Sequence, residues 1–84
     1  MRTLIKFHAS WCKPCQNMVP TMDKIKEEFD GELKFVDIDI DDNPQTRLDY
    51  NIRSIPAFVL VEDGAEIDRK IGSLTYSELE EWLD

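Results

Sequence analysis

The chain has 84 residues, of which 42% are hydrophobic, enough for one small core; a chain of this size buries only about 60 to 65% of its unfolded surface when it folds. Eighteen acidic against ten basic residues give a formal charge of −8, which repels phosphate backbones and anionic lipids and so disfavours nucleic acid and membrane partners. No repeat or linker composition interrupts the chain, and we expect a single domain over residues 1–84.

The first predicted element is a strand over residues 3–8, TLIKFH, in which only Lys6 interrupts an apolar run of β-branched and aromatic residues. The apolar run is too short for a secretory signal or a membrane span. We therefore expect a cytoplasmic protein. In that reducing compartment, two cysteines indicate catalysis or metal binding more than a structural disulfide framework.

A long helix is predicted after the cysteines. Four apolar side chains recur at spacings of four, three and four and share one helix face: Met18, Met22, Ile25 and Phe29. The helix should end at Asp30-Gly31, and Pro20 should kink it without any catalytic role.

A second strand is predicted over residues 32–41, ELKFVDIDID, because its residues alternate with a period of two. One face is aliphatic, with Val36, Ile38 and Ile40. The other face is mostly acidic: Phe35, Asp37, Asp39 and Asp41. An acidic face is typical of an edge strand, where charge discourages pairing with other chains.

The remaining elements have clear boundary signals. A short helix should run through Asp49, with Asn43 as its N-cap and Pro44 at its first position. Residues 57–61 and 66–71 flank the turn sequence EDGA and predict an antiparallel hairpin.

The final predicted helix begins at a capping box, because Thr75 and Glu78 have the required spacing, and its apolar face holds Leu79, Trp82 and Leu83. The complete order is β-α-β-α-β-β-α, and a crossover helix makes the first two strands parallel. This order predicts an α/β fold with a four-stranded mixed sheet and helices on both faces.

The two cysteines lie in FHASWCKPCQNM, residues 7–18, and allow three interpretations. A structural staple is disfavoured, because closing a ring of about four residues contributes only roughly 2 kcal/mol. Zinc requires four ligands, and the chain offers only His8 and acidic residues beside the cysteines, with no second CxxC. We expect no bound metal.

A redox-active dithiol explains more of the motif. A thiol at the start of a helix faces unsatisfied N–H groups that stabilise a thiolate, and Cys12 lies where the helix begins. Pro14 suits an early helical position. Cys15 should be more buried behind Cys12, so that Cys12 attacks a substrate disulfide and Cys15 resolves the mixed disulfide.

At this point the sequence resembles the thioredoxin family over almost its whole length. WCKPC is similar to the family's WCxPC signature, and IRSIPAFVLV is similar to the segment that carries its cis-proline. The motifs DNP, DG and KIG follow in the family's order. The resemblance implies a minimal, glutaredoxin-sized thioredoxin-like fold in which the family's usual first strand and helix are missing.

The resemblance also implies site residues. A flat apolar groove beside the disulfide would hold an extended substrate segment, with Pro56 as the cis-proline; its members would be Trp11, Ile55, Pro56, Ile71 and Gly72. Electrons would come from an external thioredoxin reductase or its equivalent, without a bound cofactor. The expected partners are disulfide-containing proteins, and we expect a monomer.

Three positions depart from the family. A buried Asp usually lies six residues before the first cysteine, near a Lys on the neighbouring strand, whereas here those positions hold Lys6 and Asp37. Lys6 therefore either forms a buried pair with Asp37 or reaches solvent along its aliphatic chain. Lys13 replaces the usual Gly, and its charge should stabilise the Cys12 thiolate and make the couple more oxidising.

The predicted function is a protein-disulfide reductase that acts through Cys12 and Cys15. A glutathione-dependent, glutaredoxin-like reductase is one alternative, suggested by the short length. A binding or assembly subunit that uses the fold without turnover is another. Trp11 and the WCxPC form disfavour the first, and the presence of both cysteines disfavours the second.

Overall fold

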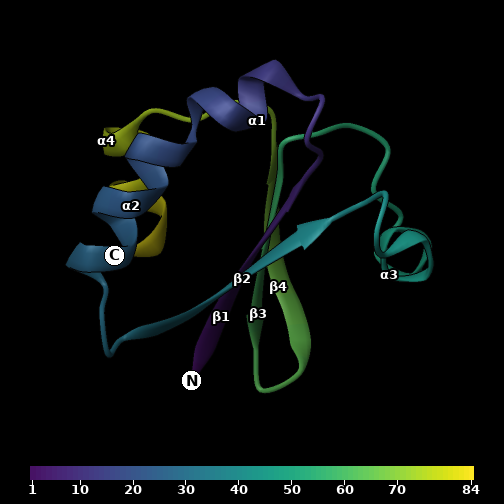
Figure 1. Ribbon diagram of the computed structural model, residues 1–84. Coiled ribbons are helices and arrows are strands. Elements are labelled where there is room, and N and C mark those ends of the chain that lie inside the picture. The colour runs from purple at the N-terminus through teal and green to yellow at the C-terminus, as the bar shows by residue number, and fades with distance from the viewer.

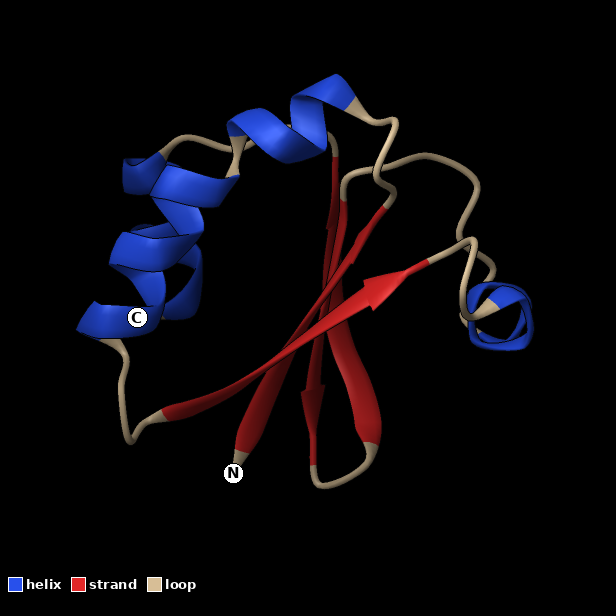
Figure 2. Cartoon of the chain, in the orientation of Figure 1, coloured by secondary structure: helices blue, strands red, loops and turns tan.

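A four-stranded sheet divides the protein, with helices on both of its faces (Figures 1 and 2). The computed structural model describes residues 1–84. The elements in chain order are β1 (Arg2–His8), α1 (Lys13–Asn17), α2 (Val19–Glu28), β2 (Leu33–Asp39), α3 (Pro44–Asp49), β3 (Ala57–Glu62), β4 (Ala65–Ile71) and α4 (Tyr76–Leu83). No helix is long and apolar enough to span a bilayer.

The strand order is β2-β1-β3-β4, with β1 and β2 parallel and the other two pairs antiparallel. This arrangement confirms the predicted mixed sheet and the position of β2 at its edge. Helices α2 and α4 lie on one face of the sheet and α3 on the other (Figure 1).

Because successive side chains of a strand point to opposite faces, β1 supplies two separate cores. Leu4 joins the helical cluster, on the side of α2 and α4: Leu4, Met18, Met22, Ile25, Phe29, Leu33, Phe58, Leu60, Leu79 and Leu83. Ile5 and Phe7 join the cysteine cluster, on the opposite face: Ile5, Phe7, Ala9, Cys12, Cys15, Ile40, Ile52, Ala57 and Val59.

The predicted long helix is two helices that meet at Met18. The prediction of a single kinked helix was wrong because Pro20 has no N–H to donate to the carbonyl of Gln16, so the hydrogen-bonding ladder is interrupted there. Met18 instead closes α1 by donating to the Cys15 carbonyl at 3.1 Å, and its own carbonyl starts α2 by accepting from Met22 at 2.8 Å. The four predicted apolar side chains nevertheless lie in one cluster.

The faces of β2 also differ from prediction. Phe35, expected on the acidic face, packs against the helical cluster, while Ile38 packs against the cysteine cluster. Val36 is 41% exposed although it belongs to the aliphatic set. Both faces of the sheet are covered, so alternating residues of β2 pack against two different cores. The strand does not have one buried and one acidic, exposed face.

The other boundary signals are confirmed. Asn43 is the N-cap of α3, although its side-chain amide donates to the Asp39 carbonyl at 3.1 Å and does not cap the helix. Asp63 and Gly64 both adopt positive φ angles in the β3–β4 turn, as a tight hairpin requires. The capping box of Thr75 and Glu78 is complete at the start of α4.

Candidate functional site

The two cysteines form a disulfide at the start of α1. Cys12 is the N-cap of this helix, and its Sγ accepts a hydrogen bond of 3.2 Å from the N–H of Cys15. Pro14 lies in the first turn, as the sequence predicted. The helix start therefore directs a backbone donor at the Cys12 sulfur, and after reduction the same donor favours a thiolate there.

Cys15 is buried, as the sequence predicted, but Cys12 is less accessible than expected. Cys12 is 5% exposed and Cys15 is 3% exposed, so the expected contrast between an exposed and a buried cysteine is almost absent. The reason is that Cys12 packs into the cysteine cluster beside Ala9 and Ala57. The exposed feature next to the disulfide is the indole of Trp11, which is 66% exposed.

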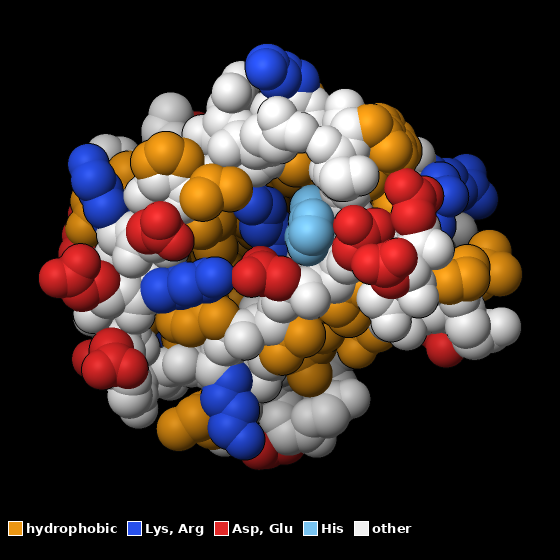
Figure 3. Space-filling model, viewed as in Figure 1, with side chains coloured by type: hydrophobic (Ala, Val, Ile, Leu, Met, Phe, Trp, Pro, Cys, Tyr) orange, Lys and Arg blue, Asp and Glu red, His pale blue; other side chains and the backbone are white.

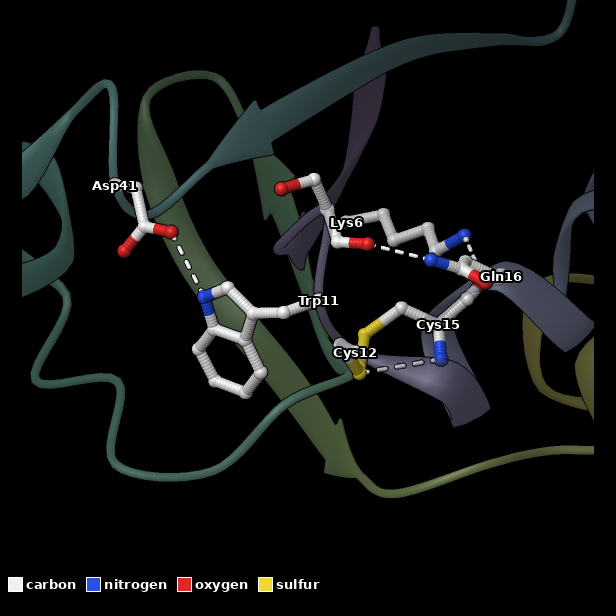
Figure 4. The surroundings of a disulfide bond; sticks show 7 residues. Lys6, Trp11, Cys12, Cys15, Gln16 and Asp41 are labelled. Atoms are coloured by element: carbon white, nitrogen blue, oxygen red, sulfur yellow. Dashed lines mark hydrogen bonds between the residues drawn. A yellow bond between two sulfur atoms is a disulfide. The ribbon is translucent and has the colours of Figure 1, made fainter.

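Trp11 is fixed by a residue that the sequence reasoning missed. Its Nε1 donates to Asp41 Oδ2 at 2.8 Å, which joins the loop after β1 to the turn after β2 (Figure 4). Because β1 and β2 are parallel neighbours, the loops that follow them begin at the same end of the sheet. That topology, together with the acidic residues at the end of the second predicted strand, is the signal that could have identified Asp41.

The groove residues come from the loop before β3 and the end of β4. The Ile55–Pro56 peptide bond is cis, as the family resemblance implied. The Pro56 side chain is fully buried, and its carbonyl accepts a hydrogen bond of 2.8 Å from the N–H of Gly72. Ile71, opposite Ala57 in the sheet, is 52% exposed.

The backbone of Ile55 is unpaired. Its side chain is half-buried against the cysteine cluster, while neither its N–H nor its carbonyl is hydrogen-bonded within the chain. Because the Pro56 side chain is buried, it offers no apolar surface to a substrate. The neighbours of Pro56 form the apolar surface of the groove instead.

Lys6 corrects both predictions made for it. It does not reach solvent, because it is 5% exposed. It does not pair with Asp37 either, although the two residues are opposite each other in the β1–β2 register. Instead, Lys6 Nζ donates to the carbonyl of Cys15 at 3.3 Å (Figure 4). Asp37 is half-exposed, and its Oδ2 is 3.0 Å from the Nζ of Lys26, a residue of α2.

A pocket of about 360 Å³ opens beside Lys6, and its lining includes Lys6, His8, Cys15, Asp23, Lys26 and Asp37. In Figure 3 the chain's only histidine, in pale blue, lies at the edge of this hollow between cationic and acidic side chains. Burial lowers the pKa of Lys6, and the carboxylate of Asp37 opposes that shift.

The last predicted tuning residue is Lys13, whose side chain is exposed at the first position of α1. It makes no hydrogen bond or ion pair within the chain. The structure gathers no group of histidine, cysteine and carboxylate side chains that is arranged to hold a metal ion.

Comparison with known proteins agrees with this site. The family model for thioredoxin matches residues 1–84. The thioredoxin of Rickettsia conorii is 40% identical over 81 residues, which cover 96% of this chain and 77% of that protein. The thioredoxin of Porphyra purpurea is 41% identical and thioredoxin 1 of a Nostoc species is 35% identical, each with 96% of this chain and 76% of the relative covered.

Proposed function

The chain belongs to the thioredoxin family of thiol-disulfide oxidoreductases, and from this premise we propose that it reduces protein disulfides through Cys12 as the attacking and Cys15 as the resolving cysteine. The observation that carries this assignment is the hydrogen bond from the Cys15 N–H to the Cys12 sulfur at the N-cap of α1. It marks Cys12 as the sulfur whose thiolate form the fold supports.

Exchange then takes two steps. The Cys12 thiolate attacks one sulfur of the substrate disulfide, and the other substrate sulfur leaves as a thiolate and takes a proton from water. Cys15, as a thiolate, next attacks the Cys12 sulfur and releases the second substrate thiolate. Two electrons have passed to the substrate, and the protein is left with the Cys12–Cys15 disulfide that the structure shows.

The free backbone groups of Ile55 support a binding mode for the substrate. An extended segment of the substrate protein pairs with the unbonded N–H and carbonyl of Ile55, in the manner of an added strand. The exposed side chains of Trp11 and Ile71 supply apolar contacts on either side. Gly72 contributes by holding the carbonyl of Pro56, which fixes the loop that presents Ile55.

A thioredoxin family member takes disulfide-containing proteins as substrates and electrons from a reductase. We propose that the electron donor here is a thioredoxin reductase, that the chain acts as a monomer without a resident cofactor, and that it works in the cytosol, where a dithiol is kept reduced.

The test is the reduction of a disulfide-linked protein such as insulin, with either NADPH and thioredoxin reductase or glutathione as the electron source. We expect turnover with the reductase, none for Cys12→Ser, and an accumulated mixed disulfide for Cys15→Ser, identified by mass spectrometry. The folding of each variant is checked by urea denaturation. Activity that survives Cys12→Ser would refute the assignment, and turnover with glutathione alone would favour a glutaredoxin-like role.

A further inference from the structure

The one buried charged side chain of the protein belongs to Lys6. It lies at the centre of β1, and its Nζ contacts the carbonyl of Cys15 at 3.3 Å. No carboxylate lies within ion-pair distance of it. A buried ammonium without a paired carboxylate is unusual, because desolvation of a charge is costly. The cost of burying Lys6 beside the redox-active Cys15 suggests that its charge has a chemical role.

The charged groups around Lys6 are two carboxylates and a second lysine. From β2, Asp37 faces it but is bound to Lys26 at 3.0 Å. From α2, Asp23 and Lys26 line the same pocket with opposite charges, and His8 follows along β1. Burial, the largest effect, lowers the pKa of Lys6, while Asp37 and Asp23 raise it. Among these groups, Lys6 is the one that is hydrogen-bonded to Cys15.

The pocket connects the surroundings of Lys6 and Cys15 to water. It is lined by Lys6 and Cys15 together with residues of α2 and β2, and none of the proposed substrate-groove residues contributes to it. Figure 4 shows the Lys6 side chain running past Cys15 on the side away from Trp11. A proton of Cys15 can therefore reach solvent while a substrate covers the groove.

We propose that Lys6 is a positioning residue for the resolving step, in which its ammonium stabilises Cys15 as a thiolate while the proton of Cys15 leaves through the pocket. The proposal rests on the assigned role of Cys15. The Cys15 thiolate forms a bond to the Cys12 sulfur, and the bond between Cys12 and the substrate breaks with its electron pair on the substrate sulfur. Lys6 keeps its proton throughout.

The same ammonium acts when the protein is reduced again. A reductase thiolate that attacks the Cys12 sulfur expels Cys15 as the leaving thiolate, and a leaving thiolate of lower pKa departs faster. Lys6 therefore assists Cys15 in both directions of exchange. Lys13, whose side chain is exposed, has no such contact.

The direct test measures the ionisation of Cys15 in a Cys12→Ser background, where it is the only thiol. The ultraviolet absorbance of the thiolate is followed against pH in this variant and after addition of Lys6→Met or Lys6→Gln. We expect the pKa of Cys15 to rise by about one unit in both, a roughly tenfold loss of thiolate at a given pH. Lys6→Arg, which keeps the charge, should restore it.

Lys26→Met is the matched control, because it removes a second cation from the same pocket that is already bound to Asp37. Its effect on the Cys15 pKa should be less than a third of that of Lys6→Met. An unchanged or lower Cys15 pKa in the folded Lys6→Met and Lys6→Gln variants overturns the proposal. An equal shift from Lys26→Met also overturns it.

Kinetics separate this proposal from the assigned function. In the chain with both cysteines, Lys6→Met should slow the release of the mixed disulfide severalfold and leave the first attack by Cys12 unchanged. If the parent chain fails to reduce insulin, the proposed function falls while the thiolate titration still decides the role of Lys6. Equal slowing of both steps would contradict a role confined to Cys15.

Discussion

The two faces of the sheet are built differently. The helical cluster consists of apolar side chains, most of them large, packed between the sheet and two helices. The cysteine cluster contains two alanines and the two cysteines, and its covering helix α3 has no buried residue of its own. The helical cluster therefore holds most of the large packed side chains. The cysteine cluster has a thinner cover, which places the disulfide near the surface.

The largest expected effect is on the helical side. Ile25 is fully buried between α2 and the sheet, and Ile25→Ala leaves a cavity there that the surrounding helices cannot fill. We expect a loss of about 4 kcal/mol in the free energy of unfolding, measured by urea denaturation. The reduction potential of the disulfide should not change. A loss below about 1 kcal/mol would show that this face is not the main source of stability.

The matched substitution on the other face is Ile52→Ala. Ile52 is buried in the cysteine cluster just after α3, where the thin cover can move inwards to fill part of the cavity. We expect a smaller loss, about 2 kcal/mol, by the same measurement. A loss equal to or larger than that of Ile25→Ala would remove the contrast between the faces.

This contrast also explains which parts of the fold the sequence predicted. The helical cluster was readable because its members in α2 follow the helical spacing from Met22 to Phe29. The cysteine cluster draws Ile40 and Ile52 from separate turns, and no periodicity connects them. The break at Met18 was missed because a proline signal alone does not distinguish a kink from a new helix start.

At the site, the motif identified both cysteines and the cis-proline, since these lie in short sequence signatures. The side-chain contacts were beyond prediction. The Trp11–Asp41 hydrogen bond and the Lys6 contact with Cys15 join residues 30 and nine positions apart. The family resemblance offered Asp37 as a partner for Lys6, but α2 brings Lys26 to the same carboxylate. Only the tertiary arrangement decides between two such cations.

A third prediction concerns the capping box that holds α4 on the helical side. Thr75 Oγ1 accepts from the N–H of Glu78, and Thr75→Ala should cost about 1 kcal/mol of stability without changing the reduction potential. A measured change in potential would connect α4 to the disulfide and contradict the separation of the two faces.

The control for the Thr75 prediction is the pH dependence of the stability that Glu78 contributes. Hydrogen bonds from the backbone N–H and then the side chain of Thr75 lower the pKa of Glu78 below 4.5. A lowered folded-state pKa contributes stability above the unfolded pKa, and this contribution is lost as the pH falls through the folded value. The stability difference between the parent chain and Glu78→Ala should therefore be largest near pH 7 and narrow below about pH 4. A difference that grows on acidification would contradict this hydrogen bonding.

The smallest expected effect belongs to the cysteine side and involves no packing. Lys13 is exposed between the cysteines, and its charge favours the thiolate of the reduced form. Removing an exposed charge costs about 0.5 kcal/mol, so Lys13→Gly should lower the reduction potential by about 10 mV. Equilibration with a glutathione redox buffer measures this shift, and an unchanged or higher potential would contradict it.

Two further substitutions separate the charge of Lys13 from the backbone freedom that glycine adds at the first position of α1. Lys13→Arg keeps the charge and should keep the potential, whereas Lys13→Ala should lower it as glycine does. Because the side chain is solvated, the shift should shrink at about 1 M salt, where the Debye length is only about 3 Å. The effect of Lys6, a buried cation bonded to the Cys15 carbonyl, should persist under the same conditions.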